Sequence, residues 1–321
     1  MNPSIALRSP NLGQPALARW HRSEDVTFRI VVAGSAANLD VAELLRSRLF
    51  LASLRVTRSI YQECTYPPPL LDDHRPLPER ARHRLIPLEI RAAEPARSSP
   101  WHRSPICSMD YVLIQPDPHR FYPYAYEMTV AVPRRYAHCL APRSLYNLVD
   151  LVPGERCDVK FHAVYLHASD WRDFTIAQAC DLHVAWRNDF IPERLAAVGC
   201  PISEDRYVNF NEHLRQFIAY ANRAHAAGEL DLIIANGDII DYIYENGALR
   251  PGYAWDYPGA SDRYKLGNFE YFHDLVIARA PASLPGGSGI RVGEELEVPL
   301  FTALGNHDYR QRIPSDVPAR S

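Results

Sequence analysis

Residues 230–241 read LDLIIANGDIID, and this stretch decides the fold of the second half of the chain. Its first six residues form an almost continuous apolar run, which is typical of a strand covered on both faces. The run leads into the motif Gly237-Asp238-Ile239-Ile240-Asp241, written G-D-x-x-D. A strand of this kind, followed by a glycine and a carboxylate, predicts an α/β sheet with polar side chains at the carboxyl edge of its strands.

Two more strand-like runs lead into polar motifs in the same way. Residues 174–179 precede Asp181-Leu182-His183 (D-x-H), and residues 300–304 precede Gly305-Asn306-His307-Asp308 (G-N-H-D). In open α/β sheets, ligands bind at the carboxyl ends of the strands. We therefore expect the three motifs to meet at one edge of the sheet.

Helical patterns separate these strands. Apolar residues recur at helical spacing over residues 210–221, and Gly228 is placed to end that helix. The resulting β-α-β order implies parallel strands joined by a right-handed crossover. Residues 242–297 form a Tyr- and Trp-rich insertion with a second predicted helix over 269–276. A local mini-core is the expected role of the insertion, and a substrate-stacking surface is the alternative.

The residue types of the motifs favour metal binding. Asp181 and His183 are two residues apart, so that in an extended strand they point the same way. The glycines before Asp238 and Asn306 permit tight turns that bring short side chains close to an ion. Carboxylate, imidazole and amide donors together suit Mn, Fe or Zn better than Ca. Two such ions about 3.5–4 Å apart could share a hydroxide and polarise a phosphate group.

In this order, the three motifs resemble those of the calcineurin-like metallophosphoesterase superfamily over residues 172–309. The resemblance implies that Asp181 and His183 bind a first metal ion, that Asp238 bridges two ions, and that Asn306 binds the second. It implies two Mn, Fe or Zn ions as cofactors and a phosphate ester as substrate. A metal-bridged hydroxide would then attack phosphorus.

The same resemblance implies catalytic roles for His307 and Asp241. His307 would assist the leaving group, and Asp241 would hold His307. An adjacent carboxylate favours the imidazolium form, which fits a general acid. Purple acid phosphatases have a metal-binding tyrosine where this chain has Asp241, and His183 also departs from their pattern, so we do not expect that subgroup.

No histidine follows His307, whereas the family pattern continues with another metal-binding histidine and a G-H-x-H element. We therefore expect an incomplete enzyme, the N-terminal part of a longer one, with a missing C-terminal segment as its partner. The expected fold class is α/β, with a β-rich accessory domain before the first half of a four-layer α/β/β/α sandwich. One alternative is an inactive fragment with a binding or assembly role, and a weaker one is a phosphodiesterase or nuclease.

The first half of the chain carries no comparable motif. We expect a flexible arm over residues 1–24, the accessory domain over 25–170, and the metallophosphoesterase part over 171–321. Apolar residues at helical spacing predict a helix over residues 40–54. Predicted strands cover residues 26–33, 111–115, 126–132 and 159–167.

Bulk properties count against some classes of partner. The formal net charge of -3 counts against nucleic acid, which usually binds a basic face. No apolar run approaches the roughly 20 residues of a membrane span. The six cysteines form no C-x-x-C pair, which favours free thiols and the cytoplasm over disulfides.

Overall fold

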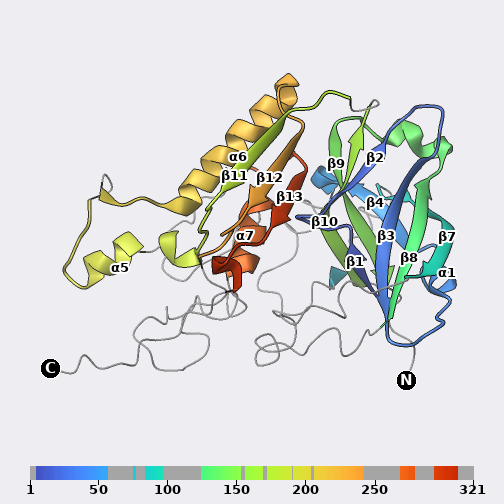
Figure 1. The fold of residues 1–321 in the computed structure, drawn as a ribbon, viewed down its shortest axis with the longest axis horizontal. Helices are drawn as coiled ribbons and strands as arrows, with labels where there is room; N and C mark the ends of the chain where they lie inside the picture. The colour runs from blue at the N-terminus through green and yellow to red at the C-terminus, as the bar shows by residue number, and fades with distance from the viewer. Residues whose placement is uncertain are drawn as a thin grey trace. The chain divides into compact units, whose positions relative to one another are not determined.

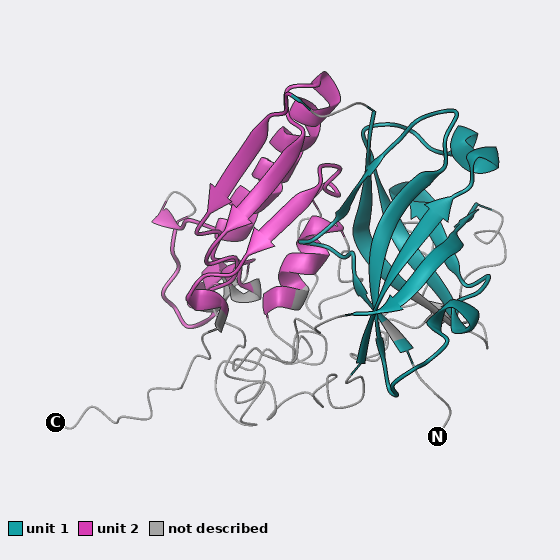
Figure 2. Ribbon diagram, turned by 45° about the vertical axis from the view of Figure 1, so that its right-hand side comes forward, with its two compact units in different colours: residues 1–63, 73–172 teal, residues 64–72, 173–321 magenta. Residues whose placement is uncertain are grey.

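The protein has a mixed α/β structure with several sheets and few helices (Figure 1). The computed structural model describes residues 5–56, 75–76, 84–96, 124–152, 156–168, 172–189, 191–203, 206–241, 268–278 and 293–309. Two compact units divide the chain, as Figure 2 shows. Unit 1 comprises residues 1–63 and 73–172, and unit 2 comprises residues 64–72 and 173–321.

Unit 1 contains two β-sheets. The first has four antiparallel strands in the order β1 (Ile5–Ser9), β3 (Val26–Gly34), β8 (Tyr124–Val132) and β7 (Glu89–Pro95). The second has the order β2 (Ala16–Arg19), β10 (Arg156–His167), β9 (Ser144–Val152), β4 (Leu49–Ser53) and β6 (Ile86–Pro87), with β5 (Arg75–Pro76) also paired to β10.

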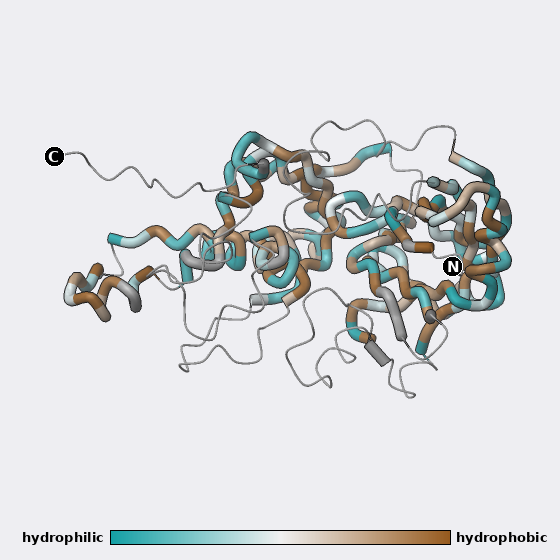
Figure 3. The backbone as a smooth tube through the Cα atoms, turned by 90° about the horizontal axis from the view of Figure 1, so that it is seen from below, coloured by the Kyte–Doolittle hydropathy of each residue, from teal (hydrophilic) through white to brown (hydrophobic). Residues whose placement is uncertain are grey.

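Both sheets of unit 1 contribute to one hydrophobic core. Along β3, buried and exposed positions alternate at first, because successive side chains of a strand point to opposite faces. Figure 3 colours the backbone by hydropathy and shows hydrophobic and hydrophilic residues interspersed along the chain. Ile30 and Met128 enter the core from the first sheet, and Leu51 and Leu148 from the second. Each such side chain contributes about 1.5–3 kcal/mol of burial free energy.

Two expectations for the first half of the chain need correction. Residues 5–9 and 16–19, which we expected to lie in a flexible arm, form β1 and β2. β1 pairs with β3 and β2 pairs with β10, and Leu7 and Ala18 are buried in the core. The prolines and arginines of this segment are not typical of strands. The strands form by pairing with other segments of the chain, which the local sequence pattern does not reveal.

The helix expected over residues 40–54 is also wrong. Helix α1 covers only Val41–Leu44, and β4 begins at Leu49 and pairs with β9. Leu49 and Leu51 fit both a helical stripe and the alternation of a strand, and tertiary pairing selected the strand. The strand predicted over residues 111–115 lies outside the described residues.

Unit 2 contains a three-stranded parallel sheet in the order β11 (Ile176–Cys180), β12 (Leu232–Asn236) and β13 (Leu300–Ala303). The three strands lie where the sequence predicted them. The predicted parallel arrangement is confirmed for all three.

Helix α6 (Phe210–Ala227) connects β11 to β12 and runs alongside the sheet (Figure 1). It begins where the Asn209 side chain accepts a hydrogen bond from the Asn211 N–H. It ends at Gly228, whose φ of 81° lies in the left-handed region, as the sequence predicted. Leu214 and Ile218 are buried, so that one face of the amphipathic helix covers apolar surface.

The other helices that the structure describes in unit 2 are short. They are α5 (Ile191–Ala197), α7 (Asn268–Val276) and two 3₁₀ turns, η5 (Trp186–Asp189) and η9 (His307–Tyr309). Helix α7 confirms the second predicted helix, whereas residues 242–267 of the insertion lie outside the described part. Among the residues that the structure describes, no helix is long and apolar enough to cross a membrane.

Candidate metal centre

The three motifs meet at the carboxyl edge of the unit 2 sheet. Beyond the strands, the Asp181 N–H donates to the Gly237 carbonyl at 3.2 Å, and the Gly237 N–H donates to the Ala303 carbonyl at 2.8 Å. The hydrogen bonds of the parallel sheet therefore continue into the motifs. This convergence agrees with the topology that the sequence predicted.

The backbone of the motifs is strained. Asp181, His183 and Asp238 have φ angles of 54°, 45° and 47°, in the left-handed region that side chains disfavour. Each such residue costs of order 1–3 kcal/mol and persists only where its surroundings hold it. One such restraint is the His183 N–H, which donates to the Asp238 carbonyl at 2.9 Å. The neighbouring G-D-x-x-D segment therefore restrains the D-x-H segment, which is not the extended strand that the sequence predicted.

Gly305 allows the closest backbone approach in the candidate site. A Cβ at this position would collide with the backbone nitrogen and Oδ1 of Asp238 and would lie 2.8 Å from the Gly237 Cα. The His307 N–H also donates to Asp238 Oδ1 at 2.9 Å. The G-N-H-D loop is thus packed directly against the carboxylate that the resemblance assigns as the bridging ligand.

Asp181, His183 and Asp238 form a group that could hold a metal ion. One donor atom from each residue lies within 4.8 Å of the others. His183 Nε2 is 3.9 Å from Asp181 Oδ1. Two carboxylates and one imidazole suit Mn, Fe or Zn, so the donor set fits the expected ions.

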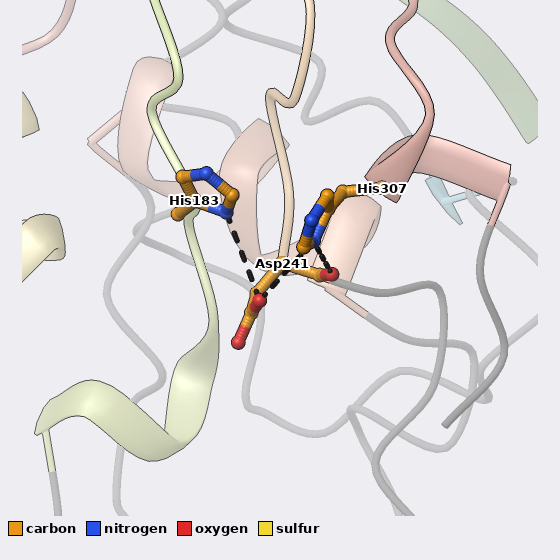
Figure 4. Close-up of side chains that lie close together, drawn as sticks. All are labelled: His183, Asp241 and His307. Atoms are coloured by element: carbon orange, nitrogen blue, oxygen red, sulfur yellow. Dashed lines mark hydrogen bonds and ion pairs between the residues drawn. The ribbon is translucent and has the colours of Figure 1, made fainter. Parts of the chain in front are cut away.

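A second group with metal-ligand spacing contains His183, Asp241 and His307 (Figure 4). The Asp241 carboxylate lies between the two imidazoles, with Oδ1 at 3.7 Å from His183 Nδ1 and 3.5 Å from His307 Nδ1. His307 Nδ1 is also 2.9 Å from the Asp241 carbonyl oxygen. Asp241 therefore lies beside His307, as the resemblance implies, and beside His183 as well.

Asn306 is exposed on the loop after β13. Its role as a ligand of a second ion stays a prediction.

Asp308 is a structural residue of the candidate site, and its role was not predicted from the sequence. It is only 1% exposed. Its Oδ1 accepts the Ile240 N–H at 2.9 Å, and its Oδ2 accepts the Gly305 N–H at 2.7 Å. A single carboxylate thus links the G-D-x-x-D and G-N-H-D loops. Its place at the end of a polar motif was the one signal available in the sequence.

A buried ion pair between η5 and α6 anchors the segment that follows the D-x-H motif. Arg215 on α6 donates from Nη1 and Nη2 to the two carboxylate oxygens of Asp189, at 3.0 and 2.6 Å. Asn209 donates to Asp189 at 2.8 Å, and the Tyr271 hydroxyl of α7 donates to it as well. Because Asp189 follows the D-x-H motif by six residues, this network ties that segment to both helices.

Burial and pairing oppose each other at Asp189. Burial raises the pKa of its carboxyl, but the hydrogen bonds and charge of Arg215 outweigh burial and hold the pKa below its ordinary value. The side chains of Arg215 and Asp189 are 6% and 8% exposed. Both groups are therefore charged in the folded protein.

Asn211 provides a further connection from the first turn of α6. Its side-chain Nδ2 donates to the Ala185 carbonyl at 2.8 Å, and its Oδ1 accepts the Ala185 N–H at 3.2 Å. One side chain of α6 therefore satisfies both the backbone N–H and the carbonyl of Ala185, two residues after His183.

Comparison with known proteins leaves the family open. No protein-family model and no curated protein matches the chain. Among solved structures, the chain is similar to purple acid phosphatase PPD1 from yellow lupin (Lupinus luteus) seeds, with a TM-score of 0.28 and 12% sequence identity. The similarity covers 93% of this chain and 36% of that one. A likeness of this extent does not assign the chain to a family.

Proposed function

We propose that unit 2 belongs to a metal-dependent hydrolase of phosphate esters. The observation that supports this most is the grouping of donor atoms from Asp181, His183 and Asp238 within 4.8 Å of one another. These residues come from two motifs more than 50 residues apart in sequence, at the sheet edge where α/β proteins bind ligands.

Each residue has a proposed role. Asp181 and His183 would hold one ion, Asp238 would be shared between that ion and a second, and Asn306 would hold the second. Bound divalent ions supply an activated water and offset the charge that develops on the phosphate group. The protein's contribution is to hold these donors rigidly, which the strained and cross-linked motif loops support.

His307 is the proposed proton donor to the leaving oxygen. With its Nδ1 proton directed at the Asp241 carbonyl oxygen, 2.9 Å away, the ring orientation is fixed and Nε2 is left for the substrate. The Asp241 carboxylate stabilises the imidazolium that donates the proton. The alternative function is a non-catalytic role in binding or assembly. An assay of phosphate-ester hydrolysis distinguishes this role from the proposed hydrolase.

The test is hydrolysis of p-nitrophenyl phosphate and of bis-p-nitrophenyl phosphate with added Mn²⁺. We expect metal-dependent turnover that Asp238→Asn lowers by about 100-fold or more, together with loss of bound metal, because a bridging ligand serves both ions. Asp173→Asn is the matched control, since Asp173 is exposed at the other end of β11. Full metal stoichiometry in Asp238→Asn would contradict the bridging role, and absence of metal-dependent turnover in the unchanged protein would favour the non-catalytic alternative.

A further inference from the structure

The two ring nitrogens of His183 face two different carboxylates. Nε2 is 3.9 Å from Asp181 Oδ1, and Nδ1 is 3.7 Å from Asp241 Oδ1. The same imidazole therefore belongs to both groups with metal-ligand spacing. Only the Asp181 side has a role in the proposed hydrolase.

The side of His183 that faces Asp241 has the dimensions of an ion site. His307 Nδ1 is 3.5 Å from Asp241 Oδ1, and the rings of His183 and His307 are perpendicular, with centroids 4.7 Å apart (Figure 4). Around a tetrahedral Zn²⁺ with bonds of about 2.0–2.1 Å, ligand atoms lie about 3.4 Å apart. The carboxylate–imidazole separations of 3.5 and 3.7 Å differ from that value by only a few tenths of an ångström, and one ring nitrogen of each histidine lies within 4.8 Å of the other.

The three side chains come from backbones that hydrogen bonds hold together. The His183 N–H donates to the Asp238 carbonyl at 2.9 Å, and the Asp241 N–H donates to the Val184 carbonyl at 3.2 Å. His183, Asp241 and His307 are each about a quarter exposed, so that an ion can enter from solvent. The arrangement is thus largely formed before an ion binds, which lowers the entropic cost of binding.

We propose that His183, Asp241 and His307 form a second, imidazole-rich site that binds one Zn²⁺ ion. Two imidazoles and one carboxylate are a donor set that suits zinc, whereas the two carboxylates and one imidazole of the Asp181 group suit Mn²⁺ better. Water completes the coordination. His307 gives up its hydrogen bond to the Asp241 carbonyl oxygen when Nδ1 binds the ion. The test of this inference does not depend on the proposed hydrolase, because it measures zinc binding alone. A zinc ion here would occupy His307 Nδ1 and the Asp241 carboxylate, and would therefore exclude the proton-donor role proposed for His307.

The test measures Zn²⁺ binding to the full chain by isothermal titration calorimetry, and the ligands of the bound ion by X-ray absorption at the zinc edge. We expect one zinc ion with two imidazole ligands. Asp241→Asn and His307→Gln should each weaken zinc binding by about 10-fold or more, because each removes one of three protein ligands. Asp181→Asn should leave zinc affinity within about threefold, and His213→Gln, an exposed histidine on α6, should leave it unchanged.

Several results would overturn the proposal. Zinc bound by one imidazole and lost in Asp181→Asn would place the ion in the Asp181 group instead. Zinc binding that both Asp241→Asn and His307→Gln retain would place it elsewhere, and no zinc binding at all would refute the site. The number of imidazole ligands on zinc in the unchanged protein distinguishes the two groups even where a variant fails to fold.

Discussion

At the scale of single residues, the candidate metal centre depends on groups that bind no ion. Gly305 permits the contact between the G-N-H-D loop and Asp238, and Asp308 connects the two loops through both carboxylate oxygens. The candidate ligands were predictable because a metal site needs particular donor atoms, and the motifs carry these in a recognisable order. It did not show the role of Asp308, because that role depends on which backbone N–H groups the fold brings to it.

We expect Gly305→Ala to lower the free energy of unfolding by about 1–3 kcal/mol, since the added Cβ collides with the Asp238 backbone. Mn²⁺ affinity should also fall, because Asp238 must move. Urea denaturation and calorimetric metal titration measure both effects. Gly228→Ala is the control: its φ of 81° costs stability, but a Cβ there meets nothing within 4 Å, so metal affinity should hold. Unchanged metal affinity in Gly305→Ala would contradict the role of this close approach.

At the scale of helices and strands, elements with strong local signals were predictable. β12 is a continuous apolar run, and α6 has a clear period, an Asn cap and a glycine at its end. The segment at residues 40–54 was not predictable, since its apolar residues suit a helix and a strand alike and the choice depends on pairing with β9. The ion pair between Asp189 and Arg215 was not predicted, because a charged residue on a helix usually faces solvent, whereas Arg215 is buried by tertiary contacts that include Tyr271 of α7.

We expect Asp189→Asn to destabilise the protein by about 3–5 kcal/mol, because it removes the buried carboxylate that pairs with both terminal nitrogens of Arg215 and leaves only the more exposed Glu212, at 3.4 Å, as an ion-pair partner. Arg215→Met combined with Asp189→Asn should recover much of that loss, since neither variant side chain carries a charge. Urea denaturation of the single and double variants gives the coupling. A single variant as stable as the unchanged protein would show that the pair does not hold the segment after the D-x-H motif.

The same pair predicts how stability depends on pH. The pKa of Asp189 is lowered in the folded protein, so the unfolded chain binds the proton more readily. Asp189 therefore contributes to the free energy of unfolding above its unfolded pKa, near pH 4. This contribution is lost as the pH falls below that value. Urea midpoints measured between pH 6 and pH 3 should fall less steeply for the double variant than for the unchanged protein. Parallel curves would contradict a charged, paired Asp189.

At the scale of the whole molecule, the chain joins a β-rich unit to an α/β unit that carries the candidate chemistry. The meeting of three motifs at one sheet edge was predictable, because parallel strands place their carboxyl ends together. The position of Asp241 between two imidazoles was not, since it depends on turns whose φ angles are unusual for residues with side chains. The sequence therefore predicts which residues converge better than it predicts which of them touch.

The most direct test of the metal centre is the anomalous scattering of Mn²⁺ in a crystal of the full chain. We expect an anomalous peak about 2.0–2.3 Å from donor atoms of Asp181, His183 and Asp238. A manganese peak away from these three residues, or an Asp181 carboxylate too far from Asp238 to share an ion, would contradict a metal centre built by the D-x-H and G-D-x-x-D motifs.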